Sequence, residues 1–176
     1  SGLALALLSP LMLLVALAVR LEGGPGILFR QERVGVDGRH FQLLKFRSLK
    51  PVDETESATN WNIAHDDRLG PVGRIIRKLS IDELPQFFNV IVGNMSLVGP
   101  RPPLPNEVEQ YTDYDRLRLI VTPGITCTWQ ISPHRNDIPF DKWLEMDLEY
   151  IETRTTWKDI RIILKTPFAM IHATGR

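Results

Sequence analysis

Asp82 and Glu83 are adjacent carboxylates that follow the basic pair Arg77-Lys78 and precede an apolar run with helical spacing. Neighbouring residues on a helix point about 100° apart, so the two groups could serve two tasks around one substrate. A carboxylate held near cations can bind a hard cation such as magnesium or attack phosphorus. Phosphate chemistry is therefore one interpretation of the pair.

The same carboxylates also match the start of a helix, which needs no chemistry. Ser80 and Glu83 have the S-x-x-E spacing of a capping box. If Asp82 is the N-cap instead, Pro85 falls at the third helical position, where its missing N–H costs no hydrogen bond. Either cap would keep the carboxylates ionised at the positive end of a helix. The pattern alone leaves the structural and the chemical interpretations open.

Two further cations stand on a predicted strand. Residues 27–35 and 39–49 are predicted strands on either side of the turn signal Val36-Asp-Gly38. Lys45 and Arg47 are two positions apart in the second strand, so both are expected on one side of it. Paired cations on one strand face suit an anionic ligand, although a solvated basic face has the same pattern.

The rest of the chain is predicted to be mainly helical, which gives an α+β fold with a small antiparallel element. Residues 99–105, GPRPPLP, form an expected extended connector that holds Arg101 stiffly. Residues 51–67 are an expected loop. Amphipathic or short helices are predicted at 72–79, 84–92, 106–121, 140–151 and 157–173, the last interrupted at Pro167. Residues 168–171 of the last helix are expected to lie on a membrane surface, as an interfacial helix does.

The N-terminal stretch 3–21 is apolar and carries no charge before Arg20. A straight helix of this length reaches about 28 Å, close to the roughly 30 Å thickness of a bilayer core. Ser9-Pro10 interrupts it, because proline lacks an N–H and crowds the preceding turn. Two topologies follow: a kinked spanning helix, or a helix-break-helix that enters and leaves on one face.

Composition excludes some classes of protein. The 21 basic and 21 acidic residues cancel, so net charge gives no reason to expect nucleic acid as a partner. Cys127 is the single cysteine, which excludes an internal disulfide and a Cys-rich zinc site. The four histidines have no metal-ligand spacing. A domain facing the reducing cytoplasm is the consistent interpretation.

Four longer stretches resemble the bacterial sugar transferase family, the monotopic polyprenyl-phosphate phosphoglycosyl transferases. They are FRQERVGVDGRHFQLLKFRSL, LSIDELPQFFNVIVGNMSLVGPRPPLP, VTPGITCTWQIS and FDKWLEMDLEYI, and they cover most of the chain in order. The residues of the last two stretches are most similar to the branch of the family that transfers hexose 1-phosphates. The resemblance implies a membrane enzyme that starts exopolysaccharide, O-antigen or capsule assembly.

The reaction that the resemblance implies is transfer of a sugar 1-phosphate from a UDP-sugar to undecaprenyl phosphate, with release of UMP. In this family the aspartate of the DE pair is the nucleophile, which forms a phosphosugar-aspartyl intermediate with magnesium. That position is Asp82 here, and Glu83 is its partner, with a role left open between metal support and proton handling. Arg77 matches the basic residue five positions before the nucleophile, and the family's basic motifs add the phosphate-binding candidates Lys45, Arg47 and Arg101.

The resemblance also implies a topology. Ser9 and Pro10 stand where the family breaks its membrane helix, so residues 1–22 are expected to form a re-entrant hairpin. Residues 23–176 are then the catalytic domain, on the cytoplasmic face of the bacterial inner membrane and in contact with its lipids. The oligomeric state is left open, with a homo-oligomer as one option.

Some features depart from the family pattern. The chain opens at Ser1 already inside the expected N-terminal pattern, and whether an upstream segment is missing is left open. Where the hexose branch tends to have S-G-R-S-D, residues 132–137 have Pro133 in place of glycine and one residue more. Arg135 and Asp137 in this loop are candidate sugar contacts, but the identity of the sugar cannot be carried over.

Two rival functions remain at this point. One is a membrane-bound scaffold without catalysis, which would have no need for both carboxylates. The other is a membrane-tethered nucleotide-sugar hydrolase, in which water replaces the lipid acceptor.

Overall fold

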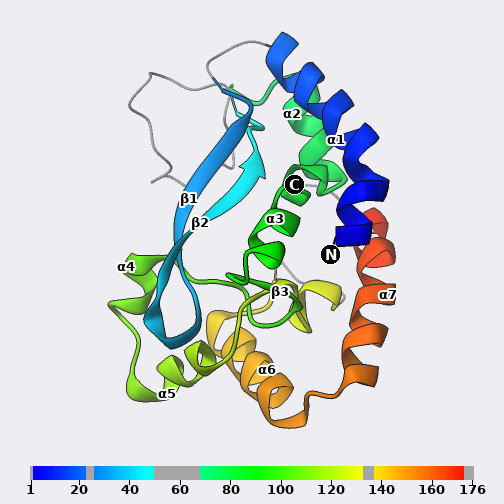
Figure 1. The fold of residues 1–176 in the computed structure, drawn as a ribbon. Coiled ribbons are helices and arrows are strands. Elements are labelled where there is room, and N and C mark those ends of the chain that lie inside the picture. The colour runs from blue at the N-terminus through cyan, green and yellow to red at the C-terminus, as the bar shows by residue number, and fades with distance from the viewer. Residues whose placement is uncertain (1, 23–25, 50–67, 133–136, 173–176) are drawn as a thin grey trace.

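The computed structural model of the chain describes residues 2–22, 26–49, 68–132 and 137–172. Its elements are mainly helical and surround one long antiparallel hairpin (Figure 1). In Figure 1 the hairpin lies on the left, and α1 and α7 lie on the opposite side of the molecule. The predicted fold class, mainly helical with a small antiparallel element, is confirmed.

The hairpin pairs β1 (Leu28–Val34) with β2 (His40–Phe46), as the turn signal predicts. Between them the short 3-10 turn η1 (Val36–Gly38) reverses the chain. Asp37 and Gly38 adopt left-handed backbone angles there, with φ of 55° and 75°. Aspartate and glycine tolerate this region better than most residues, which explains why the Asp-Gly pair marks the turn.

One face of the hairpin carries buried polar side chains. Phe29 is opposite Lys45 in the register, and residues two apart along a strand share a face. Gln31, Arg33 and Lys45 therefore point to the same side, and all three are buried. Phe46, on the other face, joins the apolar core instead.

Helix α1 (Gly2–Leu21) buries only one face. Val15 and Val19 pack against Phe46 and Ile76, whereas most of its leucines are exposed. Among the described residues, α1 is the one helix long and apolar enough to cross a membrane. Exposed apolar surface of this length is expected where lipid covers it.

The helix is continuous through Ser9 and Pro10, so the expected break is not confirmed, and re-entrant insertion stays a prediction. Pro10 cannot donate to the carbonyl of Ala6, four residues before it. The Ser9 hydroxyl donates to that same carbonyl at 2.8 Å. Because a helix in lipid must satisfy its own polar groups, Ser9 offsets the hydrogen bond that Pro10 removes.

Helix α2 (Pro71–Lys78) begins on the side chain of Glu22, just after α1. The Glu22 carboxylate accepts hydrogen bonds from the backbone N–H groups of Val72, at 2.8 Å, and Gly73, at 3.2 Å. These groups have no partner within the helix, so Glu22 caps it from outside. The end of the apolar helix is thereby fixed to the start of α2.

A second, parallel pair of strands was not predicted. β3 (Ser96–Val98) pairs with β4 (Gly124–Thr126), and the backbones come very close at Gly99 and Gly124. A Cβ on Gly124 would lie 2.1 Å from the nitrogen of Gly99. Three-residue strands give too little alternation to be recognised from sequence, and the glycines alone do not specify pairing.

The single helix predicted at 106–121 is wrong. The segment forms α4 (Pro105–Val108), α5 (Asp113–Arg116) and the 3-10 turn η3 (Leu117–Ile120). The first part ends at Val108, and Thr112 caps the second, because its hydroxyl accepts from the N–H of Asp115. A capping residue inside an amphipathic pattern interrupts the helix without disturbing its periodicity.

The C-terminal helices α6 (Phe140–Thr153) and α7 (Thr156–His172) agree with the prediction, except that Pro167 lies inside α7 without interrupting it. Ala173, the predicted end, lies outside the described residues. Val98 from β3 packs with Tyr150 and Ile162 from these helices to form the second core.

Gly73 gives a test of this packing, because α2 lies directly on the end of β2. A Cβ on Gly73 would lie 1.9 Å from the carbonyl oxygen of Ser48, whereas one on Gly2, also helical, would meet nothing within 4 Å. We expect Gly73→Ala to lower the free energy of unfolding by roughly 2–4 kcal/mol. Gly2→Ala should be neutral or slightly stabilising. Thermal unfolding of the two variants in detergent compares them, and equal stability would contradict the close contact.

Candidate active site

Asp82 and Glu83 lie in a 3-10 turn, η2 (Ile81–Glu83), that links α2 to α3 (Gln86–Ile91). Neither predicted cap is present. Ser80 has φ of 50° and forms no side-chain cap, and α3 starts four residues after Asp82. Both structural interpretations of the pair are therefore wrong, because the chain makes a separate tight turn before the helix begins.

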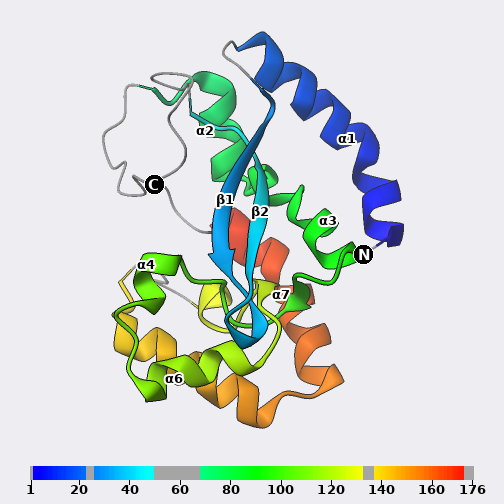
Figure 2. The same ribbon diagram turned by 60° about the vertical axis from the view of Figure 1, so that its left-hand side comes forward.

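Asn89 on α3 fixes this turn against the hairpin. Its side-chain amide donates to the carbonyl of Gln42 at 2.7 Å and accepts from the N–H of Leu44 at 3.0 Å. A buried asparagine that bonds both backbone groups of one strand edge specifies a single register. Figure 2 shows α3 beside β2, and this contact places η2 next to Lys45.

Lys45 and Glu83 form an ion pair between the strand and the turn. Lys45 Nζ lies 2.7 Å from Glu83 Oε1, and the lysine side chain is only 9% exposed. Lys45, predicted from the sequence as a phosphate-binding residue, thus lies beside the carboxylate pair, and its binding of phosphate stays a prediction. Breaking a pair this sheltered would leave a buried charge without compensation, so each partner holds the other in place.

Arg77 approaches from α2, four residues after Gly73. Its Nε donates to the hydroxyl of Ser48 at 2.9 Å, so the contact at Ser48 positions both residues. The charge of Arg77 acts to lower the pKa of Asp82, which places it within electrostatic range of that carboxyl. Arg77, predicted as a substrate-binding residue, therefore lies near the carboxylate pair, and its contact with substrate stays a prediction.

Asp82 is the buried member of the pair, with 8% of its surface exposed. Burial raises the pKa of its carboxyl to about 6, and the neighbouring Glu83 carboxylate adds to the rise. Lys45 and Arg77 oppose it. Asp82 is therefore mostly ionised at pH 7, and the nearby cations and a backbone hydrogen bond, not a helix end, favour its charged form.

Arg33 is a site residue that our sequence interpretation missed. It is 3% exposed, donates to the Pro102 carbonyl at 2.8 Å and is braced by the side chain of Gln31. Burial, followed by the charge of Arg101, lowers the pKa of Arg33 to about 10, and the Glu83 carboxylate opposes this. The sequence contained a signal for Arg33, because a hairpin turning at Asp37-Gly38 places it on the same face as Lys45.

Arg101 lies on the extended connector, as predicted, with its guanidinium 6.0 Å from the centre of the Trp129 ring. The buried Arg118 donates to the Arg101 carbonyl at 3.2 Å and pairs with Asp147 on α6. Burial raises the pKa of Asp147 to about 6, against the influence of Arg118. This pair, which periodicity gave no means of finding, supports the backbone of the connector.

Other predicted contacts lie elsewhere. Arg47 directly follows β2, and its guanidinium donates to the carbonyl of Val19 in α1 at 3.3 Å; its predicted contact with phosphate stays a prediction. Asp137 is exposed in a bend before α6. Arg135 lies outside the described residues.

Asp82 and Glu83 fit the predicted magnesium, although they are not a complete metal site. Across the described parts of the chain, no group of three or more His, Cys, Asp or Glu side chains gathers as metal ligands. Magnesium commonly binds through one or two carboxylates together with substrate phosphates. After burial, repulsion by the Glu83 carboxylate raises the pKa of Asp82, and a cation bound between the two carboxylates would relieve that repulsion.

Comparisons with known proteins agree with the resemblance found in the sequence. A family described as "Bacterial sugar transferase" matches residues 1–173. A "Galactosyl transferase CpsE" of Streptococcus agalactiae is 42% identical over 167 residues, which cover 89% of this chain and 37% of that protein. A "UDP-glucose:undecaprenyl-phosphate glucose-1-phosphate transferase" of Escherichia coli is 42% identical over 171 residues, which cover 93% of this chain and 37% of that protein.

A shorter relative is matched over most of its length. The "Exopolysaccharide production protein ExoY" of Sinorhizobium fredii is 38% identical, and the alignment covers 98% of this chain and 82% of that protein. The chain thus spans little more than a third of the first two relatives and most of the third.

The raised pKa of Asp82 predicts that this residue destabilises the fold. Above pH 6 the folded state holds a carboxylate that is more easily accommodated in the unfolded chain, whose pKa is near 3.8. In EDTA at pH 8 we expect Asp82→Asn to be more stable than the wild type by on the order of 1–3 kcal/mol. The gain should shrink as the pH falls from 6 toward 3.8, and it should vanish below that, where the carboxyl is neutral in the folded and the unfolded state.

Chemical denaturation at several pH values measures this difference. Asp141→Asn, at an exposed position of α6, is the matched control and should change stability by less than about 0.5 kcal/mol. A wild type that is more stable than Asp82→Asn at pH 8 would contradict the assigned burial.

Proposed function

This chain belongs to the bacterial sugar transferase family, and we propose that it transfers a sugar 1-phosphate from a UDP-sugar to undecaprenyl phosphate. The observation that supports the proposal is one buried carboxylate, Asp82, with a pKa of about 6 beside Glu83 and near Lys45 and Arg77. Such a carboxylate is ionised at neutral pH, and the cations suit the oxygens of a phosphoryl group. Arg33 adds a further cation, which is buried, on the Glu83 side.

In the first proposed step, an oxygen of Asp82 attacks the β-phosphorus of the UDP-sugar. A bond forms between that oxygen and phosphorus, and the bond from phosphorus to the bridging oxygen breaks. UMP leaves with the bridging oxygen and its electron pair. The sugar phosphate remains on Asp82 as an acyl phosphate.

In the second step, a phosphate oxygen of undecaprenyl phosphate attacks the same phosphorus. The bond to Asp82 breaks, the carboxylate regains its electron pair, and the product is the undecaprenyl diphosphate sugar. A single nucleophile can thus serve an aqueous donor and a lipid acceptor in turn. Neither step requires a proton from the protein, so we assign Glu83 to cation support and not to proton transfer.

Asp82 and Glu83 are the residues that would hold magnesium. When bound, the ion would neutralise charge on the donor phosphates. The chain's own residues orient the site: Lys45 fixes Glu83, and Ser48 holds Arg77 in range of Asp82.

The membrane location follows from α1 in this proposal. Its exposed leucines are expected to lie in lipid, which would bring the adjoining α2 and its Arg77 to the bilayer surface. We propose re-entrant insertion with the site on the cytoplasmic face of the inner membrane, where nucleotide sugars are available. The names of the relatives refer to galactose and glucose, so a hexose 1-phosphate is the proposed group and an early step of exopolysaccharide, O-antigen or capsule assembly the proposed role.

The direct assay supplies the full chain with magnesium, undecaprenyl phosphate and a panel of UDP-hexoses and UDP-N-acetylhexosamines, and measures both UMP and glycolipid. We expect equal amounts of the two products with a UDP-hexose. Asp82→Asn should lower the rate at least about 10³-fold, whereas Asp141→Asn should keep it. UMP without glycolipid would favour a hydrolase, and no UMP with any donor would favour a scaffold.

The pH dependence tests the role of Lys45. The rate should fall as the pH drops below about 6, because a protonated Asp82 cannot attack. Since the lysine charge lowers the pKa of Asp82, Lys45→Gln should raise that pKa and shift the acid limb of kcat/KM to higher pH. A limb that stays in place or moves to lower pH would mean that another group controls it.

A further inference from the structure

A cationic cavity lies on α7, away from the Asp82 cluster. Its volume is about 360 Å³, and it is formed between α7 and the segment around the 3-10 turn η4 (Trp129–Ile131). The described residues that line it include three cations and no carboxylate; they are Thr128, Ile131, Thr155, Trp157, Lys158, Arg161, Ile162 and Lys165. None of them belongs to the candidate active site.

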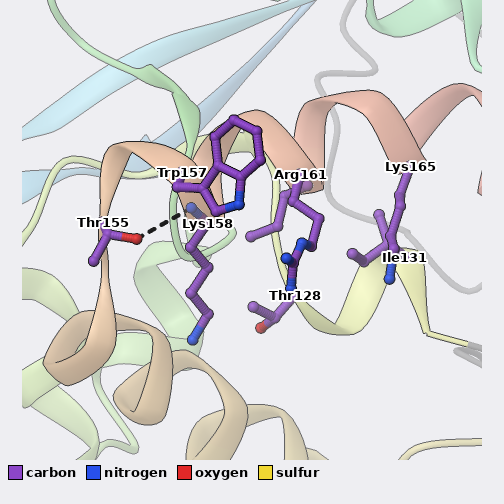
Figure 3. A pocket seen from close by; sticks show the side chains of 8 residues that line it. Thr128, Ile131, Thr155, Trp157, Lys158, Arg161 and Lys165 are labelled. Carbon is purple, nitrogen blue, oxygen red and sulfur yellow. Dashed lines mark hydrogen bonds between the residues drawn. The ribbon is translucent and has the colours of Figure 1, made fainter.

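Two of the three cations, Arg161 and Lys165, extend into this cavity from one side of the helix (Figure 3). In Figure 3 the Arg161 side chain extends from α7 toward Thr128, and that of Lys165 extends toward Ile131. Lys158 is held at the other end, where its Nζ donates to Thr153 Oγ1 at 2.6 Å. Within the described part of the chain, Arg161 and Lys165 form no ion pair. The cavity therefore offers positive charge without an acidic partner, which suits a phosphate ester.

The neighbouring stripe of α7 is apolar and exposed. At 100° per residue, Trp157, Leu164 and Phe168 fall within a narrow sector next to the sector that holds Arg161 and Lys165. Their exposed fractions are 68%, 64% and 67%. Ile160 continues the same stripe, and Ile162 lies on the opposite, buried face.

A helix with an apolar stripe next to a row of cations is suited to a membrane surface. Tryptophan and other large apolar side chains enter the boundary between headgroups and acyl chains, and flanking cations reach the phosphates. A soluble nucleotide would use the cations but not the apolar stripe beside them. From this juxtaposition we infer that the α7 cavity binds the phosphate of an anionic phospholipid, with the apolar stripe seated in the same leaflet.

The test uses the full chain in a non-ionic detergent, titrated with phosphatidylglycerol or phosphatidylcholine, with bound lipid counted by native mass spectrometry. We expect the wild type to bind phosphatidylglycerol about tenfold more strongly than phosphatidylcholine. The double variant Arg161→Gln with Lys165→Gln should lose this preference. Both positions are exposed, so the fold should be retained.

Two matched variants separate this site from general charge effects. Arg30→Gln with Arg39→Gln removes the same charge from exposed hairpin positions and should leave the preference unchanged. Arg161→Lys with Lys165→Arg keeps the charge and should also retain it. The inference is overturned if the Arg161 and Lys165 double variant keeps the preference, or if the hairpin variant loses it equally. Displacement of phosphatidylglycerol by an equal concentration of UMP would overturn it as well, because the cavity would then be a site for free phosphates.

Discussion

The arrangement of the site depends on one constraint: a carboxylate, Asp82, is buried beside a second carboxylate. Burial and Glu83 raise the pKa of Asp82 to about 6, and the cations Lys45 and Arg77, helped by a backbone hydrogen bond, oppose a further rise. The Lys45–Glu83 ion pair is therefore central, because it balances one charge and ties the turn to the hairpin. This arrangement of charges destabilises the free protein, and it can stabilise the charge of a phosphoryl group during the proposed reaction.

The rest of the fold can be understood as a frame for that turn. Asn89 fixes α3 to β2, the contact of Gly73 with Ser48 fixes α2 to the end of the same strand, and Arg77 uses the same serine. Glu22 then connects α2 to the apolar α1, because its side-chain carboxylate accepts hydrogen bonds from two backbone N–H groups of α2. Through these contacts the helix that is expected to enter the lipid is joined, element by element, to the residue proposed to react.

The parts of the molecule that could be predicted were those with a local signal. The Asp-Gly turn specified the hairpin, and long amphipathic periods specified α6 and α7. Contacts between distant segments could not be predicted, because periodicity carries no information on partners; the β3–β4 pair and the Arg118–Asp147 pair are examples. The helix caps predicted for the carboxylates were wrong because Ser80 adopts a left-handed conformation and starts a separate turn. The residue preferences of helix caps do not predict such a turn. Arg33 could have been found from the hairpin register, which places it on the same face as Lys45.

The central claim is that Asp82 is the nucleophile. Incubating the full chain with magnesium and a UDP-hexose but no lipid acceptor, quenching in acid and mapping peptides by tandem mass spectrometry tests it most directly. The account predicts a phosphohexose adduct on Asp82 that disappears, with formation of glycolipid, when undecaprenyl phosphate is added. An adduct on Glu83 or another residue, or glycolipid formation by the Asp82→Asn variant at the normal rate, would contradict it.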